Sequence, residues 1–216
     1  MALDNLVVLL SGDALIKDAV LVALLWWSWE RPDGPKPGPS MVRTVIGVLV
    51  ALAVARIMQD LLPARPRPLY DPGVLAGGFV VPFGVPKDIL HDWSSFPSDN
   101  AVLAFALATP LFLTSRALGL FAYFWATVII CLPRLYLGYH FASDLVGGAV
   151  IGAAIMLVAA RMPVPVRISR MVEHFMLVHR GLVYAALFLL TYQVATTFDD
   201  VRRTVRTVAE FALEKT

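Results

Sequence analysis

The chain has 216 residues, of which 58% are hydrophobic and 16% are charged, and its formal net charge is +2. The mean hydropathy of +0.72 is far above that of a soluble domain of this size, so the composition predicts an integral membrane protein. The small net charge gives no indication of nucleic-acid binding, and the single cysteine, Cys131, excludes an internal disulfide framework or a thiolate metal site.

Six apolar stretches each approach the ~20 residues needed to cross a hydrocarbon core. They cover residues 14–29, 42–62, 98–114, 117–133, 142–161 and 181–198. The sequence therefore predicts an all-α fold, a polytopic membrane bundle of about six transmembrane helices within a single domain, 1–216. The first stretch is too long, and too poor in basic residues at its start, for a cleavable signal peptide.

Two connections are rich in proline. Residues 31–40 hold four prolines and two glycines and predict a rigid turn. Residues 63–97 form the longest connection and contain seven prolines. A connection of this length more often has a functional role than serves only to link two helices.

Basic residues gather in the loops 31–43, 114–116 and 161–173. By the positive-inside rule these loops face the cytoplasm, so the remaining polar fragments are expected on the outer face of the cell membrane. The C-terminal tail, 199–216, conflicts with this rule because six crossings would place its arginines outside. Either the tail is an amphipathic helix on the outer surface, which we favour, or the last stretch does not fully cross.

Three polar fragments lie at the edges of apolar stretches. They are Arg65-Pro66-Arg67-Pro68, Phe96-Pro97-Ser98-Asp99-Asn100, and Arg134 followed by His140 and Asp144. Because His140 and Asp144 are four residues apart at the start of the fifth helix, they share a helix face. Asp144 can accept a hydrogen bond from one ring nitrogen and leave the other as a nucleophile.

The other polar residues are suited to holding an anion. The guanidinium of Arg134 can clamp phosphate oxygens in bidentate fashion. Ser98, Asp99 and Asn100 open the third helix, where free amides and the helix dipole favour negative charge. Each fragment alone has a simpler explanation: an interfacial His–Asp pair, an ordinary N-cap, or lipid-headgroup anchors at Arg65 and Arg67. Their joint occurrence on one face favours a shared phosphate site.

These motifs resemble the three-part signature of the type 2 phosphatidic acid phosphatase superfamily over about residues 40–161. Its integral-membrane branch dephosphorylates lipid phosphates and diphosphates. The segment 95–99 is similar to that of bacterial undecaprenyl-diphosphatases, which implies a bacterial inner membrane. The resemblance implies that His140 attacks phosphorus to form a phosphohistidine and that Asp144 orients it. Arg67, Ser98, Arg134 and the amide of Asp99 would hold the phosphate, without a metal or other cofactor.

Two positions depart from the family pattern. Asp60 stands where the family has a lysine, and we expect it to pair structurally with Arg56 or Arg65, with Arg65 compensating for the missing cation. Asn100 stands at the catalytic position of the family's general-acid histidine, and an amide cannot deliver a proton. Asp99, Asp92 or His91 are alternative proton donors in the same region.

The expected partners are the membrane and a lipid phosphate or diphosphate. The loss of the general acid favours a diphosphate, because a lipid phosphate is already a weak base and leaves without protonation. The expected reaction is hydrolysis of an isoprenoid, undecaprenyl-type diphosphate to the monophosphate. A lipid phosphotransferase and a pseudo-enzyme that binds lipid phosphates without turnover remain as alternatives, and the oligomeric state is not indicated.

Overall fold

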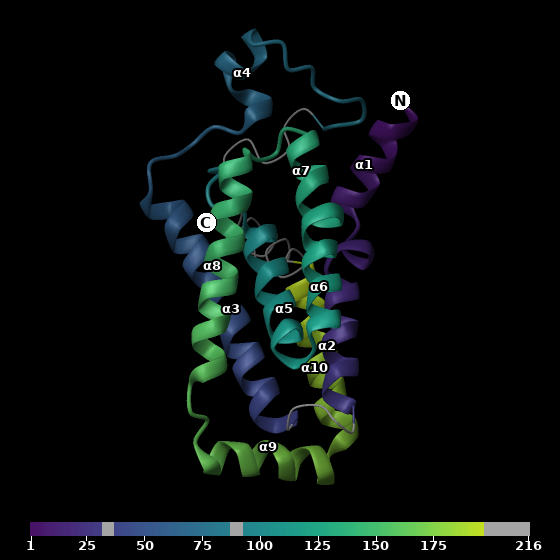
Figure 1. The fold of residues 1–216 in the computed structure, drawn as a ribbon, viewed down its shortest axis with the longest axis vertical. Coiled ribbons are helices and arrows are strands. Elements are labelled where there is room, and N and C mark those ends of the chain that lie inside the picture. The colour runs from purple at the N-terminus through teal and green to yellow at the C-terminus, as the bar shows by residue number, and fades with distance from the viewer. Residues whose placement is uncertain (32–36, 87–92, 197–216) are drawn as a thin grey trace, which may run out of the picture.

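The structure is a computed structural model that describes residues 1–31, 37–86 and 93–196, and every regular element in these ranges is a helix. This confirms the all-α expectation for the described part of the chain. The helices form an elongated bundle, with the long connection and the N-terminus at one end (Figure 1). The longer helices are α3 (Pro37–Leu61), α5 (Asp99–Thr114), α8 (Ala142–Arg161) and α10 (Arg180–Ala195).

Shorter elements complete the bundle. The first apolar stretch, 14–29, becomes the π-helical turn η1 (Leu15–Ala19) and α2 (Val20–Glu30), and α1 (Ala2–Gly12) precedes it. A second composite helix joins α6 (Arg116–Trp125), the π-helical η3 (Ala126–Cys131) and α7 (Leu132–Tyr136). The long connection contains the 3₁₀ turn η2 (Pro68–Tyr70) and α4 (Pro72–Ala76), which Asp71 caps at its N-terminus.

The structure supports fewer membrane crossings than the six expected. Within the described residues, three helical segments are long and apolar enough to cross a membrane: Gly38–Leu61, Arg116–Tyr136 and Ala142–Arg161. Helix α9 (Val166–Val178) and α10 pass the same test only together, bent by 112°, which gives up to four. Sequence reasoning treated 161–173 as a loop, but α9 occupies most of it and lies across the base of the bundle (Figure 1).

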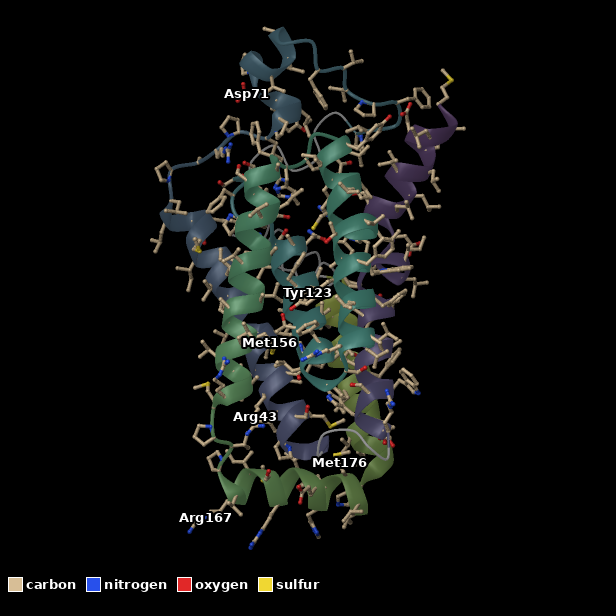
Figure 2. The ribbon with its side chains drawn as sticks, in the orientation of Figure 1. Arg43, Asp71, Tyr123, Met156, Arg167 and Met176 are labelled. Carbon is tan, nitrogen blue, oxygen red and sulfur yellow. The ribbon has the colours of Figure 1, made fainter. Side chains whose placement is uncertain are left out.

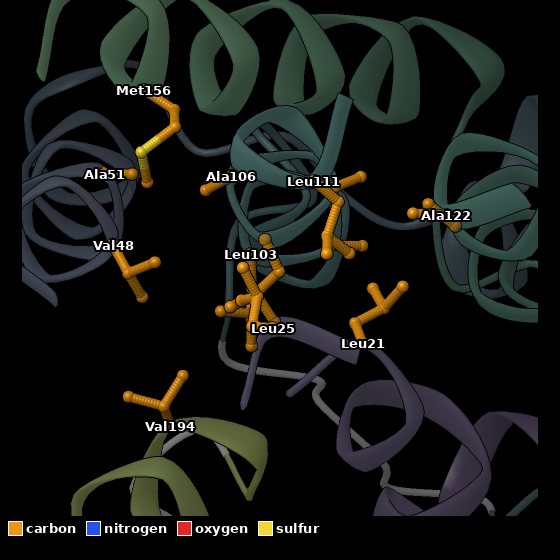
Figure 3. Close-up of a cluster of buried hydrophobic side chains, with 14 of the residues drawn as sticks. Leu21, Leu25, Val48, Ala51, Leu103, Ala106, Leu111, Ala122, Met156 and Val194 are labelled. Carbon is orange, nitrogen blue, oxygen red and sulfur yellow. The ribbon is translucent and has the colours of Figure 1, made fainter. Parts of the chain in front are cut away.

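Helix α5 is the centre of the bundle and packs against α2, α3, α6 and α8. Ten of its sixteen residues are buried, so this short helix is enclosed by the longer ones. Leucine and alanine side chains from α2, α3, α5 and α6 belong to the same buried cluster as Met156 of α8 (Figure 3). Gly152 of α8 lets the two helices approach closely, because a Cβ there would lie 2.2 Å from the Val102 carbonyl oxygen. The core thus fixes the start of α8 against the start of α5.

Charge is distributed between the two ends of the bundle. Arg43 and Arg167 lie at the end that carries α9, and Asp71 lies at the opposite end (Figure 2). Arg43 donates to the carbonyl of Met162 at 3.0 Å, which connects α3 to the end of α8. The expected amphipathic tail, 199–216, lies outside the described residues. The motif-bearing loops belong to the end with Asp71.

Candidate active site

Main-chain hydrogen bonds bring the three polar fragments together. The amide of Ser95 donates to the carbonyl of Arg65 at 3.0 Å, which joins the first fragment to the second. The amide of Ser98 donates to the carbonyl of Asp144 at 3.2 Å, which joins the second to the third. The expected proximity of the three fragments is therefore a feature of the structure.

His140 lies between α7 and α8 and is only 1% exposed. Its Nδ1 atom lies 2.8 Å from the carbonyl oxygen of Ser95, and its Nε2 atom lies 3.2 Å from a guanidinium nitrogen of Arg67. A carbonyl accepts hydrogen bonds only, so Nδ1 carries the hydrogen and the Nε2 lone pair faces the guanidinium. Burial, aided by the charges of Arg67 and Arg134, holds the pKa of His140 well below its usual range. The ring is thus neutral, and its unprotonated Nε2 accepts from Arg67.

Asp144 does not make the expected direct hydrogen bond to His140. Its nearest carboxylate oxygen lies 3.9 Å from Nδ1 of His140, and the Ser95 carbonyl takes the position that sequence reasoning gave to Asp144. One carboxylate oxygen instead accepts from the amide of Phe141 at 2.8 Å, and the other from Arg65 at 2.6 Å. The fully buried carboxylate is therefore held by the Phe141 amide and by Arg65 rather than by the imidazole.

The two arginines of the first fragment have different environments. Arg67 is 4% exposed and donates to the carbonyl of Tyr139 at 2.7 Å, beside the imidazole of His140. Burial lowers the pKa of Arg67 to about 10, so its guanidinium keeps its charge at neutral pH. Arg65 is more exposed; it pairs with Asp144, and its guanidinium carbon stacks over the Phe141 ring at 4.1 Å. Of these two arginines, Arg67 is the one that lies beside Nε2 of His140.

A chain of charged and amide groups runs from Arg134 to the end of α3. Arg134 donates to the Asn100 side-chain oxygen at 2.7 Å, and the Asn100 amide nitrogen donates to Asp99 at 2.9 Å. The other carboxylate oxygen of Asp99 pairs with Arg56 at 2.8 Å. Arg56 also donates to Gln59, whose amide donates to the Pro97 carbonyl at 2.8 Å. Both ends of the Asn100 amide are thus occupied.

A family model described as the PAP2 superfamily matches residues 41–167, which is more than half of the chain. The chain belongs to the PAP2 superfamily. A solved structure titled "Crystal structure of Aquifex aeolicus LpxE" is 21% identical and has a TM-score of 0.47, and the match covers 74% of this chain and 87% of that one. No curated protein matches the chain.

The two departures from the PAP2 pattern have different structural settings. Asp60 is exposed, and no hydrogen bond or ion pair of its side chain is found among the described residues. The expected pairing of Asp60 with Arg56 or Arg65 is wrong, because those arginines bind Asp99 and Asp144. The Asp60 carboxylate is therefore not part of the buried site.

The proposed proton donors are also constrained by their surroundings. Asp99 is engaged by Arg56 and Asn100, which stabilise its ionised form and make it a poor acid. His91 and Asp92, the other two alternatives, lie outside the described residues. Ser98 is fully buried and caps α5, with its hydroxyl 3.5 Å from the amide of Ala101. The main-chain amide of Ser98 donates to the Asp144 carbonyl, but its hydroxyl makes no hydrogen bond to the other described site residues.

Sequence reasoning missed Ser95 and Gln59, and it paired Arg56 with Asp60 rather than with Asp99. Ser95 contributes a main-chain carbonyl, which any residue carries, so no sequence signal marks it. Arg56 and Gln59 lie three residues apart on one face of α3, a spacing that predicts contact between them. This three-residue spacing was the sequence signal that could have identified Arg56 and Gln59 as neighbours in the site.

Proposed function

We propose that this PAP2 protein is a membrane phosphatase that hydrolyses a lipid phosphate through a phosphohistidine on His140. In the first step, Nε2 of His140 forms a bond to phosphorus while the bond from phosphorus to the leaving oxygen breaks. In the second step, water attacks phosphorus, the N–P bond breaks and inorganic phosphate is released. The observation that supports this role is the neutral imidazole, held at Nδ1 by the Ser95 carbonyl, with Nε2 beside Arg67.

The surrounding charges suit both steps. As the N–P bond forms, the imidazole becomes positive, and the Asp144 carboxylate at 3.9 Å stabilises that charge. Arg67 and Arg134 are buried cations that can bind the equatorial oxygens, where negative charge accumulates. When substrate binds, Arg67 would donate to a phosphate oxygen instead of to the Nε2 lone pair of His140. Positioning and fixed charge then supply the catalysis, as is usual for phosphoryl transfer.

We further propose that the preferred substrate is an isoprenoid diphosphate. Asn100 carries a side-chain amide, which cannot protonate a leaving alkoxide, and this amide is held by hydrogen bonds to Arg134 and Asp99. A general acid typically contributes ~10²- to 10⁴-fold in rate, and its absence is tolerated best when the leaving group is a weak base. A lipid monophosphate leaving from a diphosphate meets that condition.

The test is phosphate release by the purified full-length protein from undecaprenyl diphosphate, phosphatidic acid and phosphatidylglycerol phosphate. We expect the diphosphate to be hydrolysed fastest and the His140→Asn variant to lose release from all three. His174→Asn is the matched control, because His174 is exposed on α9 at the other end of the bundle. Release that survives in His140→Asn would refute the phosphohistidine.

The leaving-group argument has its own measurement. We expect Asn100→His to raise release from the two monophosphates relative to release from the diphosphate. Equal rates for monophosphates and the diphosphate in the unaltered protein would refute the preference for a diphosphate. Transfer of labelled phosphate to an acceptor hydroxyl rather than to water would instead identify a phosphotransferase.

A further inference from the structure

The π-helical turn η1 places two charged side chains inside an otherwise apolar helical run. Lys17 and Asp18 are the buried residues of this turn, with exposed fractions of 8% and 0%. Charged residues within membrane helices are costly and usually mark a functional site. π-Helical turns are likewise found at such sites, because they redirect side chains that a regular helix would place elsewhere. Neither residue belongs to the three motifs.

The turn is held in place from both sides. The Asp13 carboxylate accepts from the amides of Leu15 and Ile16 at 2.8 and 3.1 Å, which caps the start of η1. The indole nitrogen of Trp125 donates to the carbonyls of Ile16 and Lys17 at 3.1 and 3.2 Å. Trp125 ends α6 and leads into the composite helix that carries Arg134. The position of Lys17 is therefore fixed relative to the helix of Arg134.

The charges of η1 act on the motif residues. Lys17 interacts electrostatically with Arg134, Asp18 and Asp99, and Asp18 interacts with Arg134 and Asp99. Nε of Arg134 is a buried donor without a hydrogen-bond partner within the described residues, and both Asp18 carboxylate oxygens are buried acceptors without one. Buried polar groups in this state are rare. The Arg134 donor indicates an anionic ligand or an ordered water, whereas the Asp18 acceptors indicate an ordered water or a protonated oxygen of the ligand.

Like charges also accumulate here. Lys17 and Arg67 are each repelled by Arg134, and all three are buried. Repulsion between buried cations is strong because the surroundings screen it poorly. A multiply charged anion bound among them would remove that repulsion and supply acceptors for their hydrogens.

We propose that Lys17 is a further phosphate-binding residue, which supplies from the first helix the cation that Asp60 cannot supply from α3. The neighbouring Asp18 offsets part of the positive charge when the site is empty. This inference rests on the proposed function, because it assigns Lys17 to the same phosphate site. The ligand class is a phosphate group, whether free or on a lipid headgroup.

The test compares Lys17→Met, Lys17→Arg and the unaltered full-length protein in two assays. Calorimetric titration with inorganic phosphate measures binding without turnover, and the KM for undecaprenyl diphosphate measures the lipid phosphate. We expect Lys17→Met to raise both the phosphate Kd and the KM about 10-fold, as the loss of a charge-assisted hydrogen bond would. Lys17→Arg should recover most of the affinity, and kcat should change less than KM.

Two further variants separate binding from folding. Arg43→Met removes a cation at the opposite end of the bundle and should leave both constants unchanged. If Lys17 served only to neutralise Asp18, the double variant Lys17→Met/Asp18→Asn would regain the original phosphate Kd, which would refute the proposal. An unchanged Kd in folded Lys17→Met would refute it as well. These outcomes are independent of the His140→Asn result, because phosphate binding is measured without catalysis.

Discussion

The imidazole of His140 donates from Nδ1 to the main-chain carbonyl of Ser95 at 2.8 Å, and the side chain is almost completely shielded from solvent. Burial and two nearby guanidinium groups lower the pKa of this ring below the ordinary value of 6.5, so the neutral form persists as the pH falls through that value. We expect one ¹⁵N-histidine signal in detergent micelles to remain neutral between pH 8 and pH 5. The same signal should report Nδ1 as the protonated nitrogen.

The signal of His140 can be assigned by mutation. The protein has four histidines, so the spectrum of His140→Asn should lack only the non-titrating signal. A His140 signal that titrates near pH 6.5 would contradict the neutral nucleophile. A signal protonated at Nε2 would contradict the role of the Ser95 carbonyl.

Asp144 contributes charge to the site without a short bond to the imidazole. In Asp144→Asn the side-chain volume is kept and the charge that stabilises the developing imidazolium is lost. We expect kcat to fall on the order of 100-fold, which corresponds to ~2.7 kcal/mol of the barrier, with a smaller change in KM. Asp71→Asn is the control because Asp71 only caps α4 in the long connection. Equal kinetic losses in both variants would show that the Asp144 effect is not specific to the site.

The close contact of α5 with α8 predicts a steric effect. A methyl group on Gly152 would meet the Val102 carbonyl oxygen at 2.2 Å, where main chain cannot move aside easily. We expect Gly152→Ala to lower the thermal unfolding temperature, with a free-energy cost of about 1–3 kcal/mol. Gly181→Ala on α10 has no atom within 4 Å of its added methyl group and should be neutral or slightly stabilising. A stable Gly152→Ala would mean that the helices can separate without cost.

The separation of charge along the bundle predicts its orientation in the membrane. Cys131 is the only cysteine and is buried, so a Cys131→Ala background is free of reactive thiols. A membrane-impermeant thiol reagent should label Val80→Cys, in the long connection, from outside intact cells. Arg167→Cys, at the opposite end, should be labelled only after the membrane is permeabilised. The reverse pattern would place the site on the cytoplasmic face.

Much of the site could be predicted from sequence because its side chains have distinctive chemistry and spacing. The Arg67, Asn100, Arg134 and His140 side chains meet in the structure through hydrogen bonds or through the fragments that carry them. The helical stretches 42–62 and 142–161 also correspond closely to α3 and α8. Long apolar runs constrain both the type and the position of an element, since every backbone group must be satisfied within the helix.

The remainder depends on packing that sequence spacing does not encode. The choice of Asp99 rather than Asp60 as the partner of Arg56 follows from the approach of α5 to α3. The hydrogen bond between His140 and Ser95 involves a main-chain carbonyl, which leaves no mark in the sequence. Helix α9 was missed because its apolar residues are mixed with arginines, a composition that also fits a basic loop.

Two of the bonds that unite the three fragments are main-chain to main-chain, from Ser95 to Arg65 and from Ser98 to Asp144. Such bonds do not depend on which side chain either residue carries. Exchange of a single catalytic group, such as the histidine replaced by Asn100, therefore alters the chemistry of the site and leaves its shape intact. New substrate preferences could thus arise in this scaffold by single substitutions, without prior redesign of the fold.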